Sequence, residues 1–147
     1  MILVNMVLKT KGREIFTVEQ GTPAIEALEI MAEKNIGALL VVDQKKPVGI
    51  FSERDFVRAV AKNKTTMLNM PVDSFMTKEI VSVTPSETID ECMAVMTKKH
   101  IRHLPVCESG QLVGLISIGD VVKQLIEDKD LLIDNMEKYI LGRGYGQ

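Results

Sequence analysis

Apolar and polar positions along this chain predict the same five elements twice. Short runs of β-branched residues predict strands, and stretches with apolar residues at i, i+3, i+4 and i+7 predict helices with one buried face. Each half therefore predicts strand, helix, strand, strand, helix, an α/β (α+β) pattern. The expected strands are 15–18, 38–42, 48–51, 80–83, 104–107 and 113–116, and the expected helices are 24–31, 55–61, 89–96 and 120–127.

The two halves are copies of one β-α-β-β-α unit. Residues 17–60 align without a gap with residues 82–125, at a constant offset of 65 and with twelve identical positions. Self-similarity at a fixed offset indicates a structural repeat. Two such copies are expected to pack with pseudo-twofold symmetry and to form a cleft that can hold a ligand.

Local signals predict how the first helix of each copy starts. Pro23 is expected at the first helical position, with Thr22 before it. In the second copy either Ser86 or Thr88 can cap the helix.

The segments outside the repeat predict a linker and an interaction surface. Residues 63–74 form a polar linker between domains at 10–62 and 75–128, and residues 131–141 predict a separate amphipathic helix. The last residues, 142–147, are expected to fray. Apolar residues at both ends predict a homodimer: Ile2, Leu3, Met6, Val7, Leu132, Met136, Tyr139 and Ile140.

Composition excludes several classes of function. With no Trp and few other aromatic residues, the core is expected to consist of Val, Ile, Leu and Met. A net charge of −2 gives no basic stripe for nucleic acid, and no apolar run approaches the roughly 20 residues of a membrane helix. No signal peptide is apparent. Cys92 and Cys107 lack metal-ligand spacing, which predicts packing residues, no metal site and a reducing cytoplasm.

One motif occurs in both copies, as Gly49-Ile-Phe-Ser52-Glu-Arg-Asp55 and as Gly114-Leu-Ile-Ser117-Ile-Gly-Asp120. A structural interpretation is a capping box, in which the Ser and the acid exchange backbone hydrogen bonds at a helix start. A functional interpretation is a nucleoside site: the carboxylate accepts from a ribose diol, and the Ser and helix N–H groups suit phosphate. Both can hold, because a carboxylate has about four lone-pair sites.

These motifs together resemble a tandem pair of cystathionine-β-synthase (CBS) domains, a Bateman-type module. The likeness covers residues 10–128 and includes Lys34–Val42 and Ile101–Val106. Leu8–Gly12 and Phe51–Asp55 are similar to the small stand-alone CBS-pair proteins.

The resemblance implies a binding module that takes an adenine nucleotide between the copies: AMP first, ADP, ATP, NAD(H) or S-adenosylmethionine as alternatives, with no required cofactor. It implies that Asp120 and Ser117 work with residues 11–17, and Asp55 and Ser52 with residues 78–83. The candidate binding residues are Lys11, Gly12, Ile15, Thr17, Gly37, Ala38, Ser52, Arg54, Asp55, Ile80, Ser82, Arg102, His103, Pro105, Ser117, Ile118, Gly119 and Asp120.

The copies differ in charge. The second has Arg102 and His103 where the first has Gly37 and Ala38. Arg102 is either a solvated side chain or a phosphate ligand, and His103 either packs at a strand edge or adds a pH-sensitive donor. With Lys11 expected beside Asp120, we expect phosphate contacts and a tighter site there.

Two functions follow as hypotheses. The first is a regulatory nucleotide sensor that signals to a partner protein. The alternative is a ligand-independent dimerisation or scaffold module. No nucleophile–base arrangement appears in the sequence, so an enzyme is not expected.

Overall fold

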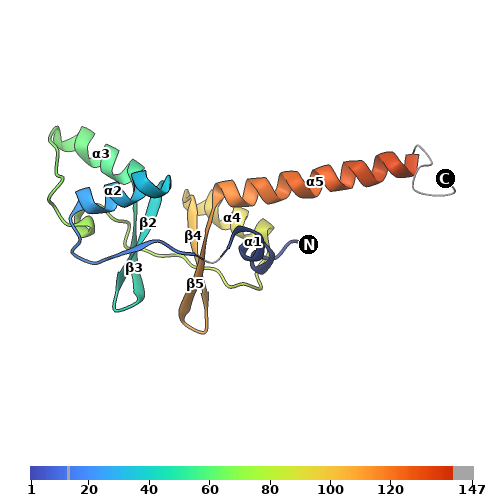
Figure 1. Cartoon of the computed structure of the whole chain (residues 1–147), viewed down its shortest axis with the longest axis horizontal. Coiled ribbons are helices and arrows are strands. Elements are labelled where there is room, and N and C mark those ends of the chain that lie inside the picture. Colours follow the sequence, from blue (N-terminus) through green and yellow to red (C-terminus); the bar gives the residue numbers. More distant parts are fainter. Residues whose placement is uncertain (13, 141–147) are drawn as a thin grey trace. The chain divides into compact units, whose positions relative to one another are not determined.

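The computed structural model describes residues 1–12 and 14–140, with the backbone alone described for Leu131, Leu132, Asn135 and residues 138–140 (Figure 1). The chain divides into two units: residues 1–12, 85–104 and 116 onward form unit 1, and residues 13–84 and 105–115 form unit 2. The elements are α1 (Val4–Lys11), β1 (Thr17–Glu19), α2 (Ala24–Lys34), β2 (Ala38–Asp43), β3 (Lys46–Ser52), α3 (Glu53–Asn63), the 3-10 turn η1 (Val72–Ser74), α4 (Ile89–Lys99), β4 (His103–Glu108), β5 (Gln111–Ser117) and α5 (Ile118–Ile140).

The predicted α/β class is confirmed, with differences in the first strand of each copy. Strand β1 pairs in parallel with β2, which pairs antiparallel with β3. In the second copy β4 pairs with β5, but the strand expected at 80–83 is reduced to one parallel bridge between Val83 and Val106. That bridge lies 65 residues after the Val18–Val41 pair of the first copy, so the pairing repeats although the strand does not.

The core of unit 2 is more aromatic than the composition predicted. Phe51 is fully buried, and its ring centroid lies 6.5 Å from that of Phe56 and 6.0 Å from that of Phe75. Phe16 packs against the same cluster. The expectation of a purely aliphatic core is therefore wrong here, because the few aromatic residues of the chain are concentrated in one place.

The N-terminal segment belongs to the core of unit 1. Helix α1 contacts α5, and α4 contacts α5. Val4 and Leu8 on α1 are fully buried, and Val7 is 3% exposed. Val7 was expected on an exposed interaction surface, and this prediction is wrong, since α1 buries that side chain within its own unit.

The segment before each copy binds the other copy's first helix start. In unit 2 the N–H of Val72 donates to the carbonyl of Thr22 (2.8 Å); in unit 1 the N–H of Val4 donates to that of Glu87 (2.8 Å). Thr22 and Glu87 are 65 residues apart, whereas Val4 and Val72 are 68 apart. The exchange of these segments explains why Val72, in the linker expected to be polar, is fully buried.

The helix boundaries settle the local predictions. Thr88 caps α4 by accepting the N–H of Glu91 at 3.1 Å, so of the two alternatives Thr88 is the cap. Helix α2 is preceded by Pro23 rather than beginning with it, and Thr22 donates to the carbonyl of Glu19 instead of capping. The two helices expected at 120–127 and 131–141 are one continuous helix, α5. Leu141 and residues 142–147 lie outside the described residues.

Candidate functional site

The Ser and Asp of the repeated motif form a capping box in both copies. Ser52 accepts the N–H of Asp55 at 3.1 Å, and the Asp55 carboxylate accepts the N–H of Ser52 at 3.2 Å. At the start of α5 the corresponding distances for Ser117 and Asp120 are 3.1 and 2.8 Å. The structural interpretation of the motif is therefore correct, and it leaves each carboxylate with further acceptor capacity.

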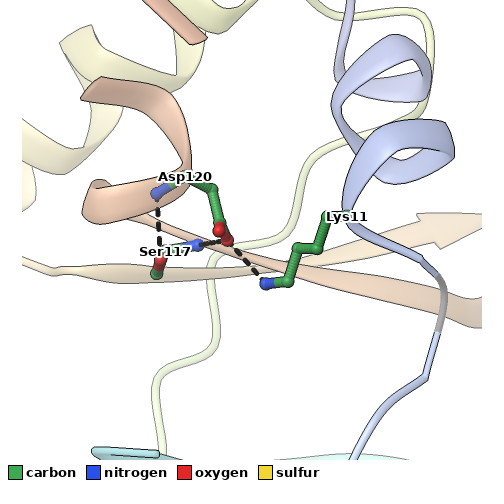
Figure 2. A network of polar contacts seen from close by, with 3 residues as sticks. All are labelled: Lys11, Ser117 and Asp120. Carbon is green, nitrogen blue, oxygen red and sulfur yellow. Dashed lines mark hydrogen bonds and ion pairs between the residues drawn. The ribbon is translucent and has the colours of Figure 1, made fainter. Parts of the chain in front are cut away.

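Lys11 adds a positive charge to the capping box of the second copy. Its ammonium group lies 2.5 Å from Oδ2 of Asp120, the same oxygen that accepts the Ser117 N–H (Figure 2). Lys11 is the last residue of α1, and Gly12 ends that helix at φ 99°, a conformation that favours glycine. The helix end thus sets where the ammonium group enters the site, while Oδ1 of Asp120 accepts no hydrogen bond from the described residues.

This environment keeps Asp120 ionised. Burial alone would raise the pKa of its carboxyl, but the hydrogen bond and positive charge of Lys11 and the hydrogen bonds with Ser117 outweigh burial, and the net pKa is lowered. Both partners are partly exposed, with 33% of the Lys11 side chain and 23% of the Asp120 side chain accessible. A solvent-borne polar ligand can therefore reach the pair.

Arg102 and His103 lie in the same unit as this pair. The carbonyl of Arg102, the residue before β4, accepts the N–H of Ile118, the first residue of α5, at 2.8 Å. The guanidinium group is exposed and forms no hydrogen bond or ion pair with any described residue. The pKa of His103 is lowered by burial first and then by the charge of Lys11, and this shift favours the neutral imidazole.

The Asp55 box lacks a comparable cation. Within residues 1–12 and 14–140, no basic side chain pairs with Asp55. Arg54 is exposed beside it, and Gly37 stands where the second copy has Arg102. A Cβ at Gly37 would meet no atom within 4 Å, so packing does not require glycine there.

The predicted site residues divide between the two units. Unit 1 contains Lys11, Gly12, Arg102, His103, Ser117, Ile118, Gly119 and Asp120. Unit 2 holds Ile15, Thr17, Gly37, Ala38, Ser52, Arg54, Asp55, Ile80, Ser82 and Pro105. Of residues 11–17, expected to work with Asp120, the structure places Lys11 against the carboxylate.

Sequence reasoning missed helix α1, which presents Lys11. The signal was present: Leu3, Val4, Val7 and Leu8 have helical spacing.

The described residues contain no cluster of three or more metal-ligating His, Cys, Asp or Glu side chains. No described helix is both long and apolar enough to cross a membrane. Cys92 is buried with its pKa raised to about 11, chiefly by burial, and Cys107 is half-buried; both are free thiols.

Comparison with known proteins identifies the repeat. The CBS domain family matches residues 11–62 and 72–127. A mitochondrial CBS-domain-containing protein of Arabidopsis thaliana, CBSX3, is 31% identical over 97% of this chain and 73% of its own length.

Two solved structures extend the comparison to the fold. A protein with CBS domains from Burkholderia ambifaria is 46% identical, with a TM-score of 0.81, over 86% of this chain and 95% of that one. The CBS-domain pair of protein MJ0100, solved in complex with 5′-methylthioadenosine and S-adenosyl-L-methionine, is 27% identical, with a TM-score of 0.76, over 88% and 98% of the two chains.

Proposed function

This chain belongs to the CBS domain family, and from that premise we propose that it is a regulatory protein that binds an adenine nucleotide, with AMP as the first candidate. ADP, ATP, NAD(H) and S-adenosylmethionine are alternatives that share adenosine. The ligands of the MJ0100 pair, 5′-methylthioadenosine and S-adenosyl-L-methionine, are adenosine compounds too, which supports this class of ligand.

The observation that carries the proposal is the Lys11–Asp120–Ser117 network. An ionised carboxylate with one oxygen, Oδ1, unused by the described residues can accept a hydrogen bond from a ribose hydroxyl. Ser117 uses its oxygen to accept the N–H of Asp120, which leaves its own hydroxyl proton for donation. The start of α5 supplies further N–H groups and the positive end of the helix dipole.

A phosphate group on the ligand can pair with two cations of unit 1, Lys11 and Arg102. A ribose diol that takes both oxygens of Asp120 competes with the Lys11 ammonium group for Oδ2. A phosphate offers Lys11 a replacement partner, and Arg102 has a planar fork of donors that suits the same group. We therefore propose that a phosphorylated adenosine binds unit 1 more tightly than adenosine does.

Thermal melting of the chain with and without AMP, ADP, ATP, NAD+, S-adenosylmethionine and adenosine tests the proposal. A ligand at about 100 times its dissociation constant stabilises the folded state by about 2.7 kcal/mol, which raises the Tm by several degrees for a chain of this size. The control is GMP, which has the same ribose and phosphate but a different base. If none of the adenine compounds shifts the Tm, the scaffold alternative is favoured instead.

The proposal also covers association, signalling, catalysis and location. We propose that two copies associate, and that ligand binding changes what a regulated partner protein recognises. We expect no catalysis, since Asp55 and Asp120 each have a capping role and a proposed ribose role. The two free thiols are compatible with the reducing cytoplasm that the sequence predicts.

A further inference from the structure

Helix α5 carries an apolar stripe that nothing described in its own unit covers. Val122, Ile126, Ile133 and Met136 are 42%, 54%, 52% and 54% exposed. With Lys129 included, the positions 122, 126, 129, 133 and 136 are separated alternately by four and three residues, which is the spacing of a coiled-coil seam. This stripe differs from the one that the sequence predicted, with which it shares only Met136. The other three side chains of the predicted stripe, Leu132, Tyr139 and Ile140, are not described.

The second half of α5 has no packing partner among the described residues. Val121 is fully buried, but every described side chain from residue 126 to residue 137 is exposed. Figure 1 shows this half of α5 extending past α1 and α4, the other helices of unit 1. Isolated helices of about 12–15 residues are marginal in water, so this length of helix, with an apolar stripe, needs a partner to be stable.

We propose that the partner is α5 of a second copy of this chain, packed antiparallel to form a two-helix coiled coil. Lys129 favours the antiparallel direction, and Lys123 with Glu137 makes the stripe complementary to a second copy of itself. A parallel pair would place Lys129 against Lys129 in the middle of the seam. An antiparallel pair places Lys129 opposite Ile133 of the second copy and next to its Asp130.

The charged residues beside the stripe also favour the antiparallel arrangement. Lys123 and Glu137 are exposed and each follows a stripe residue, Val122 or Met136, by one position. In the antiparallel pair Lys123 of each copy lies beside Glu137 of the other, which gives two opposite-charge pairs. The same register places Asp130 of the two copies side by side, with Lys129 of each copy next to them. In a parallel pair these residues are about 21 Å apart along the axis at 1.5 Å per residue and cannot meet.

The stripe is short, so the dimer is expected to be weak. Four side chains per copy bury less than the roughly 1,200–2,000 Å² of stable interfaces, and association in the micromolar range follows. This inference deepens the association proposed above and does not depend on nucleotide binding.

Sedimentation equilibrium of the full chain tests the occupant. The wild type is expected to dimerise, and the double variant Ile126→Ser/Ile133→Ser to be monomeric with an unchanged circular dichroism spectrum. The matched control is Val57→Ser: Val57 is the repeat counterpart of Val122 and is 64% exposed on α3, so its loss should leave the dimer intact. A monomeric wild type overturns both the association and this inference; a dimer that survives the double variant, or that Val57→Ser dissociates, overturns only the α5 interface.

Charge exchange tests the direction. Lys123→Glu and Glu137→Lys each turn two attractions into repulsions, and each variant alone should dimerise about tenfold more weakly, or about 1.4 kcal/mol. Mixing the two variants in equal amounts should restore wild-type affinity, because both pairs between positions 123 and 137 of the heterodimer are again of opposite charge, while position 130 is unchanged. No recovery in the mixture overturns the antiparallel arrangement even if the stripe variants dissociate the dimer.

Discussion

Replacing Asp120 by Ala is expected to weaken nucleotide binding much more than replacing Asp55. The two residues occupy equivalent capping boxes, so Asp55→Ala is a matched control for the loss of the box. What differs is Lys11, which pairs with Asp120 alone of the two. Removing Asp120 also leaves two ribose hydroxyls unpaired in a partly buried site, a loss of about 1–3 kcal/mol, or roughly 5- to 150-fold in affinity.

The effect on stability without ligand has a separate magnitude. Each variant loses a hydrogen bond to a backbone N–H, about 0.5–1.5 kcal/mol. Asp120→Ala also loses a partly exposed ion pair, about 0.2–1 kcal/mol. Both variants should therefore unfold a few degrees below the wild type, with Asp120→Ala slightly lower. The loss of affinity, by contrast, should be concentrated in Asp120→Ala.

Isothermal titration calorimetry with AMP, at a temperature where both variants are folded, separates the two effects. Equal losses of affinity in the two variants, or no loss in either, would contradict this prediction. A loss in Asp120→Ala that only matches its unfolded fraction would contradict it too. In those cases Lys11 does not distinguish the sites.

Three further predictions concern single side chains. Arg102→Ala should weaken AMP at least tenfold more than adenosine in calorimetry while moving the Tm little; equal losses for both ligands together with a lower Tm would make Arg102 structural. His103 has a lowered pKa, so the unfolded state binds its proton first as pH falls below about 6.5; the free energy of unfolding should decrease there in urea titrations, and less so in His103→Gln. Gly49→Ala should destabilise the chain by about 1–3 kcal/mol, because a Cβ at Gly49 would lie 2.5 Å from the Met76 sulfur and 3.1 Å from the Thr77 carbonyl oxygen; an unchanged urea midpoint would show that Met76 moves aside freely.

The parts of the fold that depend on local pattern could be predicted from the sequence. Helices α2 and α4 follow from apolar spacing, and strands β2 to β5 from their apolar runs. The hairpin turn repeats as well: the turns at 44–45 and 109–110 each have positive φ at both residues. The motif residues of each copy were correctly paired because a capping box is formed within four residues.

The parts that depend on distant partners could not be predicted. Residues 80–83 have the composition of a strand, but only Val83 finds a pairing partner. The burial of Val7 and Val72 results from the exchange of segments at an offset of 68, which an alignment at 65 does not show. Helix α5 continues through the charged residues 127–130 because no Gly or Pro interrupts it there.

A crystal structure of the chain grown with saturating AMP tests the central claim most directly. We expect the ribose hydroxyls to lie within hydrogen-bond distance of the Asp120 carboxylate, with the phosphate facing Lys11 or Arg102. AMP bound away from Asp120, or Lys11 still paired with Asp120 and no nucleotide in unit 1, would contradict it.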